Sequence, residues 1–144
     1  MASRGRGLKP HPPTRTIFPH HPPGVSDLAL NPSGDLDLVA GSPHLLHGED
    51  AILQDLRTRL RSFKGEWFLD TRLGLPYLDY VNGTPLAVIR AHLIKLAAAT
   101  AGIGSVRDVR FSFDRQHRKL SVTIQAVLAG TDSGELVFTE AVVV

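Results

Sequence analysis

The sequence contains no cysteine, which excludes disulfide bonds, thiolate catalysis and cysteine-ligated zinc or iron–sulfur sites. It also lacks any apolar run near the roughly 20 residues that cross a bilayer, and no apolar segment follows the first basic residues, as a secretory signal requires. Acidic residues are missing before Asp27, so the net charge of +2 reflects an excess of base near the start, at Arg4, Arg6, Lys9 and Arg15. We therefore expect a soluble protein that packing alone stabilises, without a membrane partner.

Proline and histidine are concentrated in the first 25 residues, which hold six of the ten prolines together with His11, His20 and His21. A segment with so few apolar side chains cannot offset the entropy that is lost when it becomes ordered. The rest of the chain has the length of one ordinary domain. We predict an extended arm at residues 1–25 and a single domain at residues 26–144.

A strand pattern and then a helix pattern open this domain. Residues 27–30 and 35–39 alternate around a turn at residues 31–34, which predicts a β-hairpin with one apolar face. That face comprises Leu28, Leu30, Leu36 and Leu38. Apolar residues at helical spacing then predict a helix from Glu49 to Phe63, with Leu56 and Leu60 in the core.

A segment rich in aromatic residues separates this helix from a second one. We predict that residues 66–83 form an irregular or short-stranded linker whose buried residues include Trp67, Phe68 and Tyr77. Thr84 as the N-cap and Pro85 at the first helical position predict the start of the second helix, whose core-facing stripe includes Leu93. A second stripe contacts either the first helix or a partner protein; it comprises Ala87, Ala91, Ile94 and Ala98.

Three alternating segments end the chain, at residues 109–113, 120–128 and 136–144. They predict an antiparallel β-meander on which the two helices pack, so the expected class is α+β. The last segment carries no charge after Glu140, and at an exposed edge it would template pairing with another chain. Either it lies centrally in its own sheet or a partner strand completes it, and chain order favours the second arrangement. The residues expected at this contact are Leu136, Phe138, Val142, Val143 and Val144.

No arrangement of reactive side chains indicates an active site. Glu66 and Asp70 could suggest the carboxylate pair of a glycosidase, but four residues of extended chain span about 13 Å, whereas such enzymes need roughly 5 to 9.5 Å. No histidine pair has the helical spacing of a zinc site, and His92 is expected to be a surface or boundary residue on a partly polar flank of the second helix. We expect no enzymatic activity, no metal and no cofactor.

Two basic clusters fit a solvated surface, a protein contact or a nucleic-acid contact. The first comprises Arg57, Arg61 and Lys64, and the second comprises Arg115, His117, Arg118 and Lys119. Neither is interleaved with aromatic residues, as sites for single-stranded nucleic acid are. We expect no nucleic-acid partner; the alternative function is a nucleic-acid-binding accessory protein that uses the basic N-terminal arm.

The run from Asp27 to Tyr80 resembles a known family. It carries Asp-Leu-Ala-Leu and Gly-Asp-Leu-Asp-Leu near its start, then Glu-Asp-Ala-Ile-Leu-Gln, and finally Lys-Gly-Glu-Trp-Phe-Leu-Asp followed by Gly-Leu-Pro-Tyr. These motifs are similar to those of phage baseplate wedge proteins of the Mu-type branch, which are related to baseplate assembly protein W and to the sheath initiators of contractile tails. The resemblance covers nearly all of the chain after the arm. Some relatives are labelled lysozyme-like, and the carboxylate spacing gives that label no support.

This resemblance implies a structural protein of the virion, located in the tail baseplate and, during assembly, in the host cytoplasm. Multiple copies would occupy a six-fold baseplate, where members of the family bind the wedge core and offer a sheet to which the first sheath subunits add strands. The implied partners are baseplate wedge proteins, the tail sheath protein, and tail tube or hub proteins.

One departure from the family lies between the second helix and the following strand. The wider family often has Glu-Pro-Arg there, where it grips the wedge core, whereas residues 104–108 here read Gly-Ser-Val-Arg-Asp. Only Arg107 could supply the cation. The candidate wedge contacts are therefore Arg107 and the small residues of the second helix, Ala87, Ala91 and Ala98.

Overall fold

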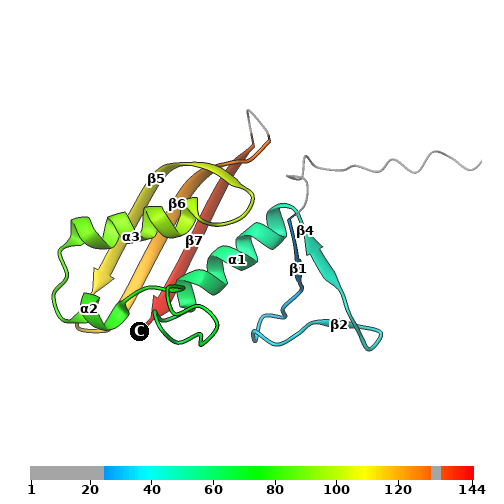
Figure 1. Cartoon of the computed structure of the whole chain (residues 1–144), viewed down its shortest axis with the longest axis horizontal. Helices are drawn as coiled ribbons and strands as arrows, with labels where there is room; N and C mark the ends of the chain where they lie inside the picture. Colours follow the sequence, from blue (N-terminus) through cyan, green and yellow to red (C-terminus); the bar gives the residue numbers. More distant parts are fainter. Residues whose placement is uncertain (1–24, 131–133) are drawn as a thin grey trace, which may run out of the picture.

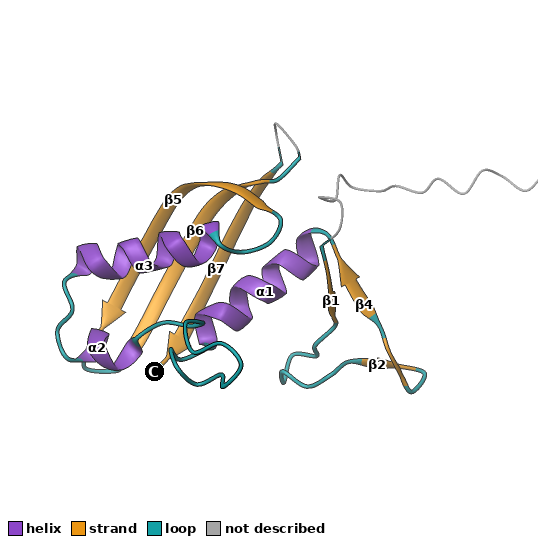
Figure 2. Ribbon diagram, viewed as in Figure 1, coloured by secondary structure: helices purple, strands orange, loops and turns teal. Residues whose placement is uncertain are grey.

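The computed structural model describes residues 25–130 and 134–144, so the predicted arm lies outside the described residues except for Val25. The elements, in chain order, are β1 (Ser26–Leu28), β2 (Leu38–Val39), β3 (Ser42–Pro43), β4 (Leu45–His47), α1 (Glu49–Arg61), α2 (Tyr77–Val81), α3 (Leu86–Ala98), β5 (Ile103–Asp114), β6 (Lys119–Leu128) and β7 (Glu135–Val143). Figure 1 and Figure 2 show α1 and α3 on the same face of the three-stranded sheet. The predicted α+β class is confirmed.

The C-terminal sheet is the predicted antiparallel meander, with strand order β5-β6-β7. Its central strand alternates strictly, and the side chains that face the helices are Leu120, Val122, Ile124, Ala126 and Leu128, all buried. Alternation is the pattern that a strand needs when one face packs and the other does not. No described helix covers the opposite face of this sheet in Figure 2.

Helix α1 begins at Glu49 as predicted. Glu49 and Asp50 in the first turn and Arg59 and Arg61 in the last turn complement the helix dipole. The helix ends at Arg61, before the predicted Phe63, because Ser62 already has an extended conformation and its N–H donates to the Thr58 carbonyl. Its buried residues pack against β7 and the N-terminal strands; they include Ile52, Leu56 and Leu60.

Helix α3 packs on β5 through Ile89, Leu93 and Ala97, which are fully buried. Pro85 stands at its N-cap without a side-chain cap. The predicted cap by Thr84 is wrong, because the Thr84 hydroxyl donates instead to the Asp79 carbonyl at 2.8 Å. This hydrogen bond ties the start of α3 to α2.

The N-terminal strands differ from the predicted hairpin. The turn at residues 31–34 forms, with a bridge between Leu30 and Leu36, but β1 pairs with β4 rather than with the segment that follows the turn. The predicted apolar face is not buried, since Leu28, Leu30, Leu36 and Leu38 are all exposed. Helix α1 packs against β1 and β4 but leaves this face open, so the four leucines keep 41–53% of their surface exposed.

Buried Gln54 joins this N-terminal part to α1. Its amide Nε2 donates to Asp27 Oδ2 and to the Leu28 carbonyl, both at 2.7 Å, and its Oε1 accepts the Leu30 N–H at 2.9 Å. All three bonds are long-range, so one side chain fixes the course of the chain on both sides of Leu28. A buried amide needs such partners to offset its desolvation.

The predicted linker at residues 66–83 contains a helix that sequence patterns missed. Tyr77 opens this helix, α2, and is fully buried, as are Leu56, Leu60 and Leu93, so these four core residues were predicted correctly. Trp67 and Phe68 were not, because 46% and 83% of their surfaces are exposed. The loop before α2 closes on itself through a parallel bridge between residues 63 and 75, which turns the intervening residues outward.

Candidate assembly surface

Strand β7 lies at the edge of the sheet, as chain order predicted, and within the described chain it pairs only with β6. The predicted contact residues divide between its two faces. Leu136, Phe138 and Val142 are buried under the helices, whereas Val143 is exposed and Val144 is half-buried. A strand added to this edge would therefore meet its backbone first rather than the three buried side chains.

The hydrogen bonds between β6 and β7 show which backbone groups of β7 have no partner within the sheet. The Val144 N–H donates to the Arg118 carbonyl and the Leu128 N–H donates to the Gly134 carbonyl, each at 2.8 Å. No register shift separates these two pairs, and hydrogen-bonded pairs alternate along an antiparallel ladder. Even-numbered residues of β7 therefore bond to β6. The N–H and C=O groups that point away from the sheet are those of the odd-numbered residues, Glu135, Val137, Thr139, Ala141 and Val143.

The opposite edge, on β5, is blunted by comparison. Its pairing with β6 shifts register twice, between Ile103 and Ser105 and between Val106 and Asp108. Asp108 also accepts hydrogen bonds from Arg110 at 2.9 Å and Arg90 at 3.2 Å, so charged side chains crowd this edge. Bulges and charges are common protections of an edge strand. β7 has no register shift, and its two charged residues are Glu135 at its first position and Glu140.

Glu140 sits at a position of β7 that faces the helices. Its Oε2 accepts a hydrogen bond from Arg57 Nε at 3.0 Å and its Oε1 accepts one from Arg61 Nη2 at 2.6 Å. The carboxylate side chain is 10% exposed, whereas the two arginines are 48% and 56% exposed. Burial alone would raise the pKa of Glu140, but the two guanidinium groups outweigh it and hold the pKa below its ordinary value. The three side chains form a network, the Arg57–Glu140–Arg61 cluster.

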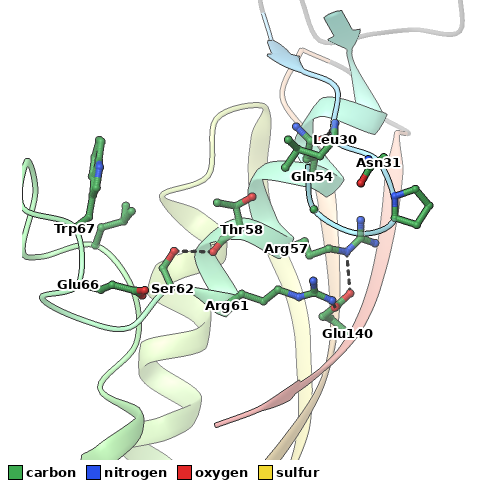
Figure 3. Close-up of a pocket in the computed structure, with 13 residues that line it drawn as sticks. Leu30, Asn31, Gln54, Arg57, Thr58, Arg61, Ser62, Glu66, Trp67 and Glu140 are labelled. Atoms are coloured by element: carbon green, nitrogen blue, oxygen red, sulfur yellow. Dashed lines mark hydrogen bonds and ion pairs between the residues drawn. The ribbon is translucent and has the colours of Figure 1, made fainter. Parts of the chain in front are cut away.

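This cluster lines a groove of about 1060 Å³, and Glu140 is the one residue of β7 in its wall. The groove follows the exposed flank of α1, between the turn at residues 30–34 and the loop that carries Trp67 (Figure 3). Its apolar lining comes from Leu30, Pro32, Trp67 and Leu73. The exposed Trp67 and Leu30 are thus walls of a surface feature rather than misplaced core residues.

A second candidate surface lies on the other helix. The stripe of Ala87, Ala91, Ile94 and Ala98 is exposed, so α1 does not cover it and this stripe is open to a partner. Arg107, the predicted cation, is the extra residue of the β5 bulge, and its exposed side chain makes no ion pair with any described residue. A bulge re-aims the side chain that it carries.

A profile of the contractile injection system sheath initiator family matches residues 26–130. The chain belongs to this family. Among solved structures, a Geobacter sulfurreducens protein described as a candidate tail lysozyme is similar at 19% identity, over 64% of this chain and 88% of that chain, with a TM-score of 0.49. That likeness carries no argument about activity, and no curated protein matches the sequence. Family membership makes the chain a structural part of a phage-type contractile tail, and it implies contact with sheath and baseplate components.

The carboxylates of this sheath initiator agree with a structural role. Glu66 Oε2 accepts the Phe63 N–H at 3.0 Å, and Asp70 accepts hydrogen bonds from the Arg72 side chain at 3.0 and 3.3 Å. The Arg72 hydrogen bonds hold the pKa of Asp70 below its ordinary value, which keeps the group ionised. A general acid needs a raised pKa, so Asp70 does not have the environment of a glycosidase acid.

Two other residues considered in the sequence analysis, His92 and Arg115, make contacts within the fold. His92, in the middle of α3, is half-buried, as expected of a residue at the boundary between surface and core, with Nδ1 2.8 Å from the Tyr80 hydroxyl. Arg115 of the second basic cluster donates to backbone carbonyls of Tyr80 and Thr84. Across residues 25–130 and 134–144 there is no group of three His, Asp or Glu residues placed to hold a metal, nor a helix with the length and apolarity to cross a membrane.

Sequence patterns missed the Arg57–Glu140–Arg61 cluster. Glu140 is 83 residues from Arg57 and 79 residues from Arg61 in sequence, so no local motif joins it to the two arginines. One signal was present, because Glu140 occupies a core-facing position between Phe138 and Val142 in the alternation of β7. A charge at such a position requires a partner from another element.

Proposed function

We propose that this sheath initiator starts the contractile sheath by accepting a strand of the first sheath subunits on the open edge of β7. The observation that carries the proposal is the contrast between the two edges of the same sheet. The edge of β5 is bulged and charged, whereas β7 offers outward backbone groups along a regular, mostly apolar strand. Strand addition uses these groups for affinity.

We further propose that the second surface binds the baseplate wedge. Ala87, Ala91 and Ala98 give α3 a flank of small side chains on which another helix could pack closely, and Arg107, which makes no ion pair with a described residue, lies on the following strand. The two proposed surfaces lie at opposite edges of the sheet, one on β7 and the other next to β5. Residues 26–144 would then act as one domain that joins wedge and sheath, in several copies around a six-fold baseplate near tube or hub proteins.

The test is a substitution that removes one outward N–H from β7. Proline at position 139 lacks an N–H, and because the Thr139 N–H points away from β6, Thr139→Pro leaves the pairing within this sheet intact. We expect Thr139→Pro to lose capture of the tail sheath protein of the same phage in a co-expression pull-down. Thr139→Ala is the matched control, since it removes the same hydroxyl but keeps the N–H.

Thermal unfolding of both variants checks the fold. If folded Thr139→Pro captures sheath as well as the original chain does, or if the original chain captures none, the proposal is wrong. Ala91→Trp, on the second surface, should leave sheath capture unchanged and weaken capture of the wedge core proteins.

A further inference from the structure

We infer that the strand accepted by β7 carries an acidic side chain on its helix-facing side, opposite Glu140, and that the Arg57–Glu140–Arg61 cluster selects for it. The inference rests on the proposed function and specifies the chemistry of the partner. It starts from the geometry of the edge. Since odd-numbered residues of β7 offer the outward hydrogen bonds, Glu140 would lie in a non-hydrogen-bonded position of the new ladder, where opposite side chains approach most closely in an antiparallel pair.

The side chain opposite Glu140 enters the groove beside two guanidinium groups. Each of these groups uses one nitrogen on Glu140, Nε of Arg57 and Nη2 of Arg61. Their other nitrogens make no hydrogen bond to any residue that the structure describes, and in Figure 3 the ends of both side chains lie beside Glu140 at the groove. Free N–H groups in a fixed fork are suited to a carboxylate.

The charge balance points the same way. Two arginines and one glutamate sum to +1, so the cluster is incomplete as an ion pair. The other acidic residue of the groove, Glu66, is engaged with the Phe63 N–H at the loop end, next to Ser62 (Figure 3). Covering the half-exposed arginines with an apolar strand would remove them from water without compensation, whereas a carboxylate would take their free donors.

The experiment compares two variants whose net charge falls by the same amount, one changed at the cluster and one changed elsewhere on α1. In Arg57→Gln/Arg61→Gln/Glu140→Gln, the whole cluster becomes neutral, so no carboxylate is left without its arginines and the net charge falls by one. The control Arg59→Gln also lowers the net charge by one. Arg59 pairs with Asp55 at 2.9 Å and does not line the groove.

Sheath capture is measured as an apparent Kd with purified sheath protein over a range of salt concentrations. We expect the triple variant to bind at least about tenfold more weakly than Arg59→Gln and to lose salt dependence. Charge reversal of the cluster, Arg57→Glu/Arg61→Glu/Glu140→Arg, should bind wild-type sheath worst and recover binding to a sheath variant in which one acidic residue of the docking strand is changed to Lys.

The outcomes separate this inference from the proposed function. If Thr139→Pro abolishes capture while the triple variant binds like Arg59→Gln, strand addition stands and the acidic selection is wrong. If Thr139→Pro binds normally, both fail. If no acid-to-Lys change in the sheath is rescued by the reversed cluster, the selection is likewise wrong. Gel filtration tests whether a second copy of this chain, rather than sheath, occupies the edge of β7. A dimer that forms with the original chain and is lost in Thr139→Pro would overturn the assignment of the edge to sheath.

Discussion

Two glycines of the loop between α1 and α2 allow a close test of how that loop is built. Gly74 has φ +89° and Gly65 has φ +86°, so both occupy the left-handed region that L side chains disfavour. A Cβ at Gly74 would lie 2.5 Å from the Ser62 carbonyl oxygen and 2.7 Å from the Phe63 carbonyl carbon, whereas a Cβ at Gly65 would meet no atom within 4 Å. The nearest atoms at Gly74 are backbone, which cannot rotate away.

We expect Gly65→Ala to cost about 1 kcal/mol, from backbone conformation alone. Gly74→Ala adds an overlap with the backbone at the end of α1, which we place at about 2–3 kcal/mol beyond that by analogy with overpacked cores. The overlap would push apart the hydrogen bonds that close the loop, from the Leu75 N–H to the Ser62 carbonyl and from the Lys64 N–H to the Leu75 carbonyl, both 3.0 Å.

Urea unfolding followed by circular dichroism measures both variants, with an unchanged slope m as the check that compactness is the same. The gain from a less flexible unfolded chain is common to both substitutions and cancels in their difference. Equal losses of stability, within about 0.5 kcal/mol, would show that close backbone approach is not why residue 74 is glycine.

Four other substitutions test the core and the cluster. Leu93→Ala should cost about 2–5 kcal/mol because Leu93 is fully buried between α3 and β5, whereas Ile94→Ala on the exposed stripe should cost about 1 kcal/mol or less; urea unfolding measures both. Tyr77→Phe removes the hydroxyl that donates to the buried Leu60 carbonyl at the end of α1, so a loss of about 1–3 kcal/mol is expected in the same assay. Because the folded pKa of Glu140 lies below its ordinary value of 4.5, its contribution to stability is complete above that pH and disappears as pH falls through the folded pKa. Unfolding measured from pH 6 down to pH 3 should therefore show a shallower acid loss in Glu140→Gln.

The elements that sequence predicted are those in which one pattern repeats over several turns or pairs. β6 alternates over its ten residues, and the apolar residues of α1 recur at helical spacing from Ile52 to Leu60. In both, one face is buried and the opposite face is more exposed, so burial alone determines the pattern. The order of the strands in the meander could be predicted because short connections join consecutive strands, which then lie side by side.

The elements that sequence did not predict depend on tertiary contacts. β4 is three residues long and pairs with β1 across residues 29–44, and no local pattern marks such a pair. The linker aromatics failed for a different reason. Trp67 and Phe68 are as apolar as core residues, and sequence composition does not separate a side chain that packs inside from one that lines a surface groove.

The candidate site shows the same division. The open edge was predicted because β7 ends the meander and carries little charge, which are local properties. The groove beside it was not, since it forms from the turn at residues 30–34, α1, the loop with Trp67 and Glu140 together. Its cluster resembles the inward-pointing charges that other proteins place on exposed strands, which is a property of the folded edge and not of any one segment.

The position of this cluster on β7 affects whether β7 can pair with the β7 strand of a second copy of the chain. If two copies paired antiparallel along β7, even-numbered residues would lie opposite even-numbered residues. Glu140 and its arginines would then meet Leu136, Phe138, Val142 or Glu140 of the second copy. The first three accept no hydrogen bond from a guanidinium, and the fourth is already held by its own two arginines. Such a dimer would bury excess positive charge without an acceptor, and an uncompensated buried charge is strongly destabilising. A strand with a carboxylate at that position avoids this cost, so the same three side chains would both disfavour self-association and select the sheath.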